Sequence, residues 1–494
     1  MQKLNFLRRI PLHSFLIGFY IISFIYVRNT SQVTLPMVYR SLGFSLLLSG
    51  LIFGISYAFY RSSRKAGIFT TLFIVGFFIY GFIYNQLETL FYKDMWPFAH
   101  IHRFLVVTYA VLYLVLFVIF YRSRRPHHNV NYALNVFVIG VFVLNAIMGM
   151  SSSNRQGRMD TGPNPFIGSL QQGIADSLKS LLRPDVYYII LDGYASEKVL
   201  EKFYGATYDG LYQYLRINNF YVADSSRTNY PTTAPSLSSS LNAQYIDSID
   251  IKSRQTLIPH NLVSHVFKKA GYRVVNIESG YAVTEHLAFS DKTIGIKGLN
   301  EFENRLLELT ILRLDDVLGF TNHLRLKSQL DRLPLIAKEK GPKFSFIHIV
   351  SPHPPFVVDS VGNRHLRNSL SDMAWEPRQD YAQQLQYVSK KVMELITLLQ
   401  RNKKNPPIII LQSDHGPWLN SPDPKEVYQA RSQILNAYFV PPAFRAKLYP
   451  TITPVNSFRL LFSELFKLDF PLLPDRPVSY DFFLNDPTFK KYAD

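Results

Sequence analysis

The first 150 residues are almost entirely apolar and aromatic, and this feature constrains the fold more than any other. A helix needs about 20 apolar residues to cross the hydrocarbon core of a bilayer. Five stretches approach or exceed that length: Ile10–Val27, Pro36–Tyr60, Gly67–Tyr92, Phe104–Phe120 and Val130–Met150. Because a bilayer offers the backbone no hydrogen-bond partners, such stretches must be helical. We predict a bundle of five transmembrane helices over residues 1–150, with a soluble helical core as the alternative.

Positive charge alternates between the loops that join these stretches. It is concentrated before the first stretch, after the second and after the fourth, at Lys3, Arg8, Arg9, Arg61, Arg64, Lys65, Arg122, Arg124 and Arg125. The positive-inside rule places such loops in the cytoplasm. The pattern therefore predicts a cytoplasmic N-terminus and an extracytoplasmic position for residues 151–494. A soluble core gives no reason for charges that alternate in this way.

The formal net charge is +17, but its distribution argues against nucleic acid as a partner. Residues 1–150 hold 13 of the 53 Lys and Arg residues and only 2 of the 36 acidic residues. The excess charge therefore comes mainly from the apolar part of the chain. A nucleic-acid-binding protein needs a basic stripe on a soluble domain, so we expect membrane lipids as partners and no nucleic acid. The chain has no cysteine, which excludes disulfides, thiolate ligands and cysteine nucleophiles.

Residues 151–183 are predicted to join the membrane part to a separate domain at residues 184–494. Ser151–Pro165 is rich in Ser, Gly, Asn and Pro, which is typical of a linker. Apolar residues then recur every three to four positions from Phe166 to Leu182, as on one face of a helix. This juxtamembrane amphipathic helix either packs beneath the following domain or lies on the membrane surface.

From Pro184 onward, apolar runs of strand length alternate with helical patterns such as Gln384–Leu399. The predicted strands are Val186–Leu191, Phe220–Ala223, Arg273–Ile277, Phe344–Val350 and Ile408–Leu411. Continuous runs of Ile, Val and Tyr that are separated by helices predict an α/β domain with a largely parallel sheet, covered by helices on both faces. In such sheets, ligands bind beyond the carboxyl ends of the strands.

Four short segments carry residues suited to catalysis. Asp192 (IILDGYAS), His353 (VSPHPPF) and Asp414-His415 (IIILQSDHGPW) each follow a predicted strand. Alone, each has a simpler interpretation, since Asp-Gly is a common turn and a histidine in a proline-rich loop is often just exposed. Together, carboxylate oxygens and imidazole suit Mn²⁺, Mg²⁺ or Zn²⁺. With Thr233 (NYPTTAPSLSSSLN) they predict a metal site with a built-in hydroxyl nucleophile.

Thr233 stands where a helix should begin, because Pro235 suits the first turn of a helix. The free backbone N–H groups at a helix N-terminus favour an anionic group such as phosphate. The simpler interpretation is an N-cap threonine, which stabilises a helix by about 1 kcal/mol. Thr232 is the neighbouring alternative for the nucleophile.

The segments DVYYIILDGY, NYPTTAPSLSSSLN, SPHPPF, LQSDHGP and YPTITPVNSFRLLF resemble the alkaline phosphatase superfamily. Within it, they are similar to the membrane-anchored, sulfatase-like branch that includes lipoteichoic acid synthases and phosphoethanolamine transferases. The resemblance covers residues 184–480 and, more loosely, the membrane part. It implies an alkaline phosphatase-like fold for residues 184–494. It also implies a multi-pass protein of the bacterial inner (cytoplasmic) membrane that acts on a cell-envelope glycan or lipid acceptor.

The resemblance implies a role for each singled-out residue. The metal ligands would be Asp192, Thr233, Asp414 and His415; the catalytic nucleophile would also be Thr233; and the substrate contact would be His353. These residues would hold one divalent ion. The sequence does not choose among Mn²⁺, Mg²⁺ and Zn²⁺.

The chain also departs from true sulfatases. Residues 233–236 match the Cys-x-Pro-Ser core of those enzymes, which favours Thr233 over Thr232 as the nucleophile. However, a threonine cannot be converted to formylglycine, and the sulfatase arginine that follows the core is Leu237 here. We therefore favour phospho-group chemistry over sulfate-ester hydrolysis. Asp359 and His365 are poorly spaced for a second metal set, so we expect a single ion.

We predict a metal-dependent, membrane-bound transferase that moves a phospho-group from a lipid headgroup to an alcohol acceptor through a covalent threonine intermediate. The alternative keeps the same site but uses water as the acceptor, as in a phosphoesterase, a phosphodiesterase or a sulfatase-type hydrolase. A third interpretation is a non-catalytic membrane scaffold on an enzyme fold. The presence together of the four expected ligands argues against that interpretation.

Overall fold

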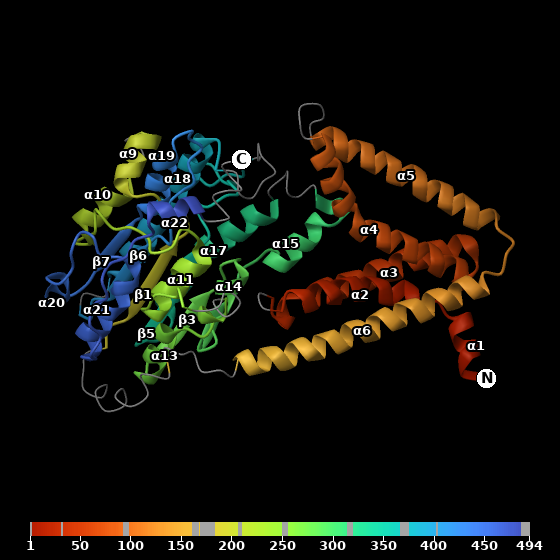
Figure 1. Cartoon of the computed structure of the whole chain (residues 1–494), viewed down its shortest axis with the longest axis horizontal. Coiled ribbons are helices and arrows are strands. Elements are labelled where there is room, and N and C mark those ends of the chain that lie inside the picture. Colours follow the sequence, from red (N-terminus) through yellow and green to blue (C-terminus); the bar gives the residue numbers. More distant parts are fainter. Residues whose placement is uncertain are drawn as a thin grey trace. The chain divides into compact units, whose positions relative to one another are not determined.

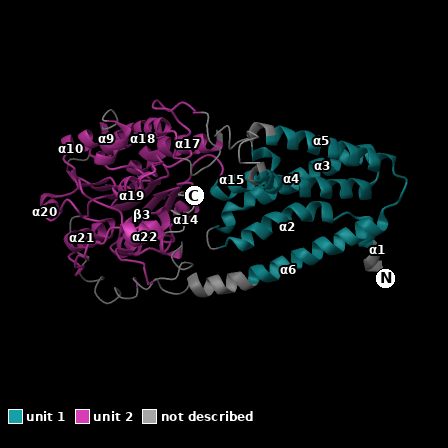
Figure 2. Cartoon of the chain, turned by 45° about the horizontal axis from the view of Figure 1, so that its top comes forward, with its two compact units in different colours: residues 1–159, 300–316 teal, residues 160–299, 317–494 magenta. Residues whose placement is uncertain are grey.

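The computed structural model describes residues 2–30, 33–91, 98–160, 167, 183–205, 210–248, 255–313, 320–365, 375–401 and 404–485. The chain forms two compact units, coloured separately in Figure 2. The first consists of Met1–Met159 and Asn300–Asp316, and the second of Asp160–Leu299 and Val317–Asp494. The first unit therefore includes a segment from well inside the predicted 184–494 domain.

Apolar helices build the first unit. The helices long and apolar enough to cross a membrane are α3 (Tyr39–Tyr60), α4 (Ser63–Phe91), α5 (Phe98–Arg122) and α6 (His128–Asp160). Helix α2 (His13–Arg28), preceded by α1 (Gln2–Arg9), is apolar but has 16 residues, fewer than the ~20 that a bilayer requires. Four of the five predicted stretches thus form helices of spanning length, and the first is shorter than predicted.

Helix α4 is the most enclosed helix of this unit. In the most apolar stretch of α4, 61% of the residues are buried. In the corresponding stretches of α3, α5 and α6, only 11 to 17% are buried. Leu47 of α3 and Leu114 of α5 are among many large apolar side chains left exposed on the other helices. Exposed apolar side chains suit a lipid environment, because the hydrocarbon core of a bilayer is itself apolar.

A buried polar cluster joins the start of α2 to α4 and α6. The His13 ring contacts Thr71 Oγ1 through Nδ1 at 2.5 Å and Asn131 Oδ1 through Nε2 at 3.2 Å. The backbone N–H of His13 donates to Asn135 Oδ1 at 2.8 Å, and both asparagine side chains donate to the C=O of Leu7. These hydrogen bonds fasten three helices together without a hydrophobic driving force, as polar groups do between helices in membranes.

Residues 300–316, which we call the strap, pack with the first unit although they follow strand β4 of the second. The strap contains α15 (Glu301–Glu308) and the short helix η4 (Ile311–Arg313). Asn300 and Glu303 form a capping box at the start of α15. Glu303 also accepts a hydrogen bond from Arg40 Nε at 2.7 Å, and Asn300 Nδ2 donates to the C=O of Met37 at 2.8 Å.

The other end of the strap contacts α4 through a buried arginine. Arg313 donates to Asn85 Oδ1 at 2.9 Å, and its guanidinium lies 3.7 Å from the ring centroid of Tyr84. The backbone N–H of Gly81 donates to the C=O of Leu309 at 3.0 Å. A Cβ on Gly81 would lie 2.1 Å from a strap carbonyl oxygen, so the close approach requires glycine.

A seven-stranded sheet forms the centre of the second unit, in the order β2-β7-β6-β1-β5-β3-β4 (Figure 1). The strands are β1 (Val186–Leu191), β2 (Tyr221–Val222), β3 (Arg273–Ile277), β4 (Lys292–Ile294), β5 (Lys343–Ile349), β6 (Ile408–Gln412) and β7 (Asn436–Phe439). Neighbours from β6 to β4 pair in parallel, whereas β7 pairs antiparallel with β6 and β2. The five predicted strands are present, but β4 and β7 were not predicted.

Helices cover both faces of this sheet, as the continuous apolar strands predict. On β1, Ile189 packs in one hydrophobic core and Tyr188 in the other, because successive side chains point to opposite faces. Helices α9 (Glu197–Tyr204), α10 (Gly210–Ile217), α17 (Phe320–Lys338) and α18 (Arg378–Leu399) contribute to the first core. Helices α11 (Thr233–Asn242), α13 (Leu262–Lys269) and α21 (Pro454–Phe466) contribute to the second.

Shorter elements complete the second unit. They are η3 (Gln255–Leu257), α14 (Ala282–Glu285), α19 (Pro424–Ser432), α20 (Pro442–Arg445) and α22 (Tyr480–Asn485); η1 (Leu35–Met37) belongs to the first unit. Where a linker was predicted from residue 151, α6 continues to Asp160. The predicted amphipathic helix between Phe166 and Leu182 lies outside the described residues, apart from Ile167.

Candidate active site

Three neighbouring strands bring the predicted residues to one edge of the sheet. Strand β1 pairs in parallel with both β5 and β6, so the three carboxyl ends meet. Asp192 directly follows β1, His353 lies in the loop after β5, and Asp414 lies two residues beyond β6. The backbone N–H of His353 donates to the C=O of Asp192 at 3.0 Å, which links the first two loops. These residues therefore lie beyond the carboxyl ends of parallel strands, which is where such sheets bind ligands.

Helix α11 presents Thr233 to this edge. Thr233 is the first residue of the helix, and Thr232 is the N-cap but makes no side-chain capping hydrogen bond. Ser236 Oγ and Thr228 Oγ1 both donate to the C=O of Asp414, at 2.7 and 2.6 Å. The first bond holds the helix, and the second holds the segment before the helix, against the loop after β6. The simple interpretation of Thr233 as an N-cap therefore does not apply.

The hydroxyl of Thr233 faces the predicted metal ligands. Its Oγ1 lies 3.1 Å from His415 Nε2 and donates to Asp192 Oδ2 at 3.4 Å. Ligand atoms of Asp192, Asp414 and His415 all lie within 4.8 Å of one another, and all three residues are buried. The structure thus brings together the four residues that were predicted from distant segments of the chain.

Two carboxylate oxygens in this cluster lack a hydrogen-bond partner. They are Asp192 Oδ1 and Asp414 Oδ2, which lie 3.5 and 3.2 Å from His415 Nε2. A buried carboxylate without a partner is strongly destabilising unless a cation compensates it. Two oxygens and one imidazole nitrogen suit Mn²⁺, Mg²⁺ or Zn²⁺. The donor set therefore fits one divalent ion.

Burial and mutual repulsion set the protonation of the pair. Burial, and then the charge of Asp192, raises the pKa of Asp414 well above its ordinary value. Burial also raises the pKa of Asp192, but the neighbouring histidines, His353 first, outweigh it and leave that pKa below its ordinary value. Burial, and then the charge of Arg431, lowers the pKa of His415, so its ring stays neutral. A bound cation would favour the ionised form of Asp414.

The tautomer of His415 suits metal binding. Its Nδ1 lies 3.0 Å from the C=O of Gly416, so Nδ1–H donates and Nε2 keeps its lone pair for the cluster. Residue 416 must be glycine, because a Cβ there would lie 1.9 Å from the C=O of Ala430. The close backbone approach is what allows the carbonyl to meet the ring.

His353 lies beside the cluster, as predicted, and not on an exposed loop. Its Nδ1 contacts the C=O of Pro354 at 2.7 Å, which leaves Nε2 as the available nitrogen. Its ring packs edge-on against Trp375 at 4.9 Å and lies 6.2 Å from the ring of His415. Gly193 makes room for this tryptophan, since a Cβ at its φ of +73° would lie 2.5 Å from the indole. His353 therefore lies next to His415, one of the predicted metal ligands.

A third histidine of the site, His348, was not predicted. His348, buried in β5, has Nε2 3.4 Å from Asp192 Oδ2 and Nδ1 2.8 Å from Thr284 Oγ1. Thr284 in turn contacts Ser279 Oγ at 2.8 Å. The available signal was a single histidine inside the otherwise apolar run FSFIHIV, where burial without a partner is costly.

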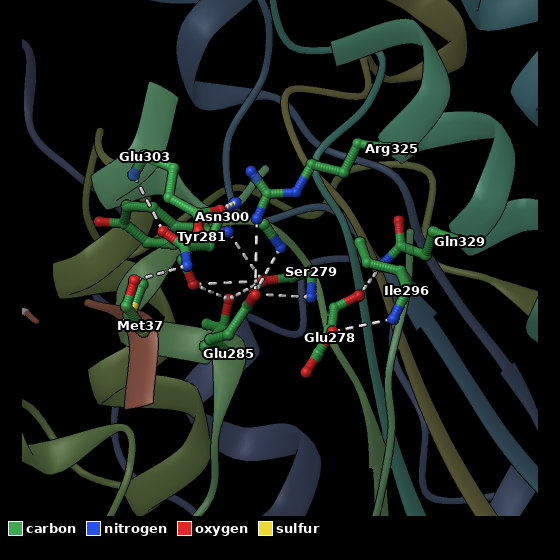
Figure 3. A network of polar contacts seen from close by, with 12 residues as sticks. Met37, Glu278, Ser279, Tyr281, Glu285, Ile296, Asn300, Glu303, Arg325 and Gln329 are labelled. Carbon is green, nitrogen blue, oxygen red and sulfur yellow. Dashed lines mark hydrogen bonds and ion pairs between the residues drawn. The ribbon is translucent and has the colours of Figure 1, made fainter. Parts of the chain in front are cut away.

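Ser279, which contacts Thr284, belongs to a polar network around the loop after β3 (Figure 3). Glu285 accepts the backbone N–H groups of Ser279 and Gly280 at 3.1 and 2.6 Å and pairs with the buried Arg325 at 3.5 Å. Glu278, which follows β3, accepts the N–H of Ile296 at 2.8 Å. These hydrogen bonds therefore fix the loop that follows β3.

The two weaker candidates for a second metal set make other contacts. Asp359 Oδ1 accepts the N–H groups of Val361 and Asn363 at 3.0 and 2.8 Å, which closes a turn. His365 Nε2 lies 3.0 Å from Asp380 Oδ2. Both are thus engaged in local contacts, and the expected single ion stays a prediction.

Comparison with known proteins decides the family. Residues 184–441, more than half of the chain, match the family model described as sulfatase. The chain belongs to the sulfatase family. The predicted resemblance and the enzyme class are thereby confirmed at the level of the family. No curated protein matches the chain.

Several solved structures are similar in fold. The C-terminal periplasmic domain of EptC from Escherichia coli, in complex with Zn, is 13% identical over 62% of this chain and 94% of that chain, with a TM-score of 0.43. The integral membrane lipooligosaccharide phosphoethanolamine transferase A from Neisseria meningitidis is 13% identical over 92% and 94%, with a TM-score of 0.39. The lipoteichoic acid synthase LtaP from Listeria monocytogenes is 11% identical over 61% and 77%, with a TM-score of 0.40. At these identities the likeness concerns the fold alone.

Proposed function

We propose that this protein is a metal-dependent, membrane-bound transferase that moves a phospho-group through a covalent intermediate on Thr233. One observation carries the proposal: Thr233 Oγ1 lies 3.1 Å from His415 Nε2 and 3.4 Å from Asp192 Oδ2, beside two unpaired carboxylate oxygens. A hydroxyl next to a cation site at a helix N-terminus is placed for nucleophilic attack on an anionic group.

A divalent cation bound by Asp192, Asp414 and His415 would lower the pKa of the neighbouring hydroxyl and screen the charge of a phosphoryl group. Side chains of the protein carry out the proton transfers and the nucleophilic attack. The Thr233 proton points to Asp192 Oδ2, its acceptor. Thr233 Oγ1 forms a bond to phosphorus while the bond from phosphorus to the leaving oxygen breaks. His353 Nε2 donates a proton to that oxygen. In the second step, His353 removes the proton of the acceptor hydroxyl, whose oxygen bonds to phosphorus while the bond from phosphorus to Thr233 Oγ1 breaks, and Thr233 regains its proton from Asp192.

The residue after the nucleophile motif supports phospho-group transfer over sulfate-ester hydrolysis. Leu237, which stands where sulfatases carry an arginine, is 1% exposed and packs in the core below the sheet. It therefore supplies no charge to the site. Thr233 also cannot form the aldehyde on which sulfatases depend.

The apolar helices support a lipid as the donor. They would hold the domain at the outer face of a bacterial inner membrane, with the N-terminus in the cytoplasm, where phospholipid headgroups are concentrated. An alcohol on a cell-envelope glycan or lipid would be the acceptor. Water in that role would make the protein a hydrolase.

The test uses the full-length protein in vesicles of phosphatidylethanolamine and phosphatidylglycerol with Mn²⁺ or Zn²⁺. We expect diacylglycerol to accumulate and a phospho-adduct to appear on the peptide that carries Thr233. T233A should abolish both, T233S should keep part of the activity, and T232A is the matched control. Free headgroup phosphate in the water, without a modified acceptor, would favour the hydrolase. Full activity in T233A would contradict the proposed mechanism.

A further inference from the structure

Arg431 bridges the segment before Thr233 and the segment after His415. It lies near the end of α19 and is 5% exposed. Its Nε donates to the C=O of Pro231 at 2.7 Å, and its Nη1 donates to the C=O of Gly416 at 3.0 Å. Pro231 lies two residues before Thr233, and Gly416 directly follows His415. One side chain therefore ties the nucleophile segment to the metal-ligand segment.

The arginine holds Gly416 from both sides. The backbone N–H of Gly416 donates to the C=O of Arg431 at 2.8 Å. The C=O of Gly416 accepts from Arg431 Nη1 and from His415 Nδ1, each at 3.0 Å. A carbonyl oxygen has two lone pairs, and these two donors occupy both. With its position fixed, the carbonyl can accept only a protonated Nδ1, which keeps Nε2 of His415 available.

The guanidinium group is suited to this task in a way that lysine is not. Its N–H donors diverge in a rigid plane, so two carbonyls in different directions are reached at once. The indoles of Trp375 and Trp418 flank it, with ring centroids 5.6 and 5.9 Å from its central carbon. These rings offset part of the cost of burying the charge.

We propose that Arg431 is a positioning residue that fixes the tautomer of His415 and sets the distance between Thr233 and the metal ligands. The inference rests on the metal-and-threonine site of the proposed function. Arg431 acts through Gly416 and Pro231 and is not itself assigned a contact with substrate.

The experiment measures Mn²⁺ affinity of the metal-free full-length protein in detergent, alongside donor turnover. R431K keeps the charge but loses the double bridge. Its matched control is R445K, because Arg445 is an exposed arginine that also donates to a backbone carbonyl, that of Asn219 at 2.7 Å. We expect R431K to bind Mn²⁺ about 10- to 100-fold more weakly, with a lower kcat and an unchanged KM for the donor, and R445K to match the wild type.

Each outcome is decisive. Wild-type Mn²⁺ affinity in R431K would overturn the inference. Weaker binding in R431K, with no turnover by the wild type, would support the inference while the proposed function fails. Absence of Mn²⁺ binding by the wild type would overturn both. Thermal melting monitors folding, and R431Q is measured if R431K melts early. Early melting of both variants would show that Arg431 serves folding alone and would also overturn the inference.

Discussion

Two buried polar clusters, one in each unit, differ in what they leave unpaired. In the first unit, both ring nitrogens of His13 have partners, Thr71 and Asn131. In the second, Asp192 Oδ1 and Asp414 Oδ2 have none. Both clusters are costly to bury. The first cluster uses its polar groups to fasten helices, whereas the second keeps oxygens available for a ligand. Between these two clusters, the unpaired carboxylate oxygens make the difference, and not burial or polarity.

The largest effect is expected at the unpaired oxygens. D414N should lose the bound metal and lower transfer activity by about 10³-fold or more, because the cation is expected to contribute several kcal/mol to the transition state. Elemental analysis of the purified protein and the diacylglycerol assay measure both. In EDTA, D414N should melt no lower than the wild type, because the variant removes one charge of a repelling pair. A much lower melting temperature in EDTA would show that Asp414 is structural.

Metal should stabilise the folded state wherever the second cluster is intact. At a Mn²⁺ concentration 100 times Kd, the gain is about 2.7 kcal/mol. Thermal melting with and without Mn²⁺ should show this gain in the wild type and in H13L, but not in D414N. An equal gain in D414N would place the metal at another site.

The first cluster should respond in stability alone. H13L removes hydrogen bonds to Thr71 and Asn131 inside the helical unit and should cost about 1–2 kcal/mol. Melting in detergent measures the loss, with the exposed His128 as the matched control in H128L. The metal content of H13L should equal that of the wild type. A loss of metal would mean that the two clusters are coupled and that the contrast between them is too simple.

The smallest effect is expected at the bonds that hold the site together. S236A removes one of two donors to the C=O of Asp414 and should cost about 1 kcal/mol, since the Thr228 hydroxyl remains. Turnover should fall with the loosened loop. S463A is the control. Ser463 lies in α21, away from the cluster, and its Oγ donates to the C=O of Phe470 at 3.1 Å. Equal turnover in S236A and S463A would show that Ser236 only stabilises the fold.

Much of the second unit could be predicted because its signals are local. Strands β1 and β3 have the predicted bounds. The run of β1 is continuously apolar and aromatic and stops before Asp192, and that of β3 is rich in Val and Ile and stops before Glu278. Strand β7 could not be predicted, because four residues, Asn436–Phe439, become a strand only by pairing with β6 and β2. Its antiparallel direction follows from where the chain returns to the sheet, which no local pattern specifies.

The first unit was harder to predict at its edges. The stretch predicted to begin at Ile10 forms a helix only from His13, which leaves α2 short of spanning length. The strap has the amphipathic pattern of an ordinary surface helix. Its packing with the apolar helices depends on Glu303 and Arg313 meeting Arg40 and Asn85, which are distant in sequence.

The sequence by itself determined which residues stand at the strand ends and at the helix start, because apolar runs, prolines and turns act over a few neighbouring positions. Asp192, His353, Asp414 and His415 were identifiable on that basis, whereas the family resemblance was needed to choose Thr233 over Thr232. Only the tertiary structure decided which oxygens lack partners, which nitrogen of His415 keeps its lone pair, and how His348 and Arg431 reach the cluster. Those properties depend on hydrogen bonds between distant segments, and such bonds exist only after the sheet has assembled.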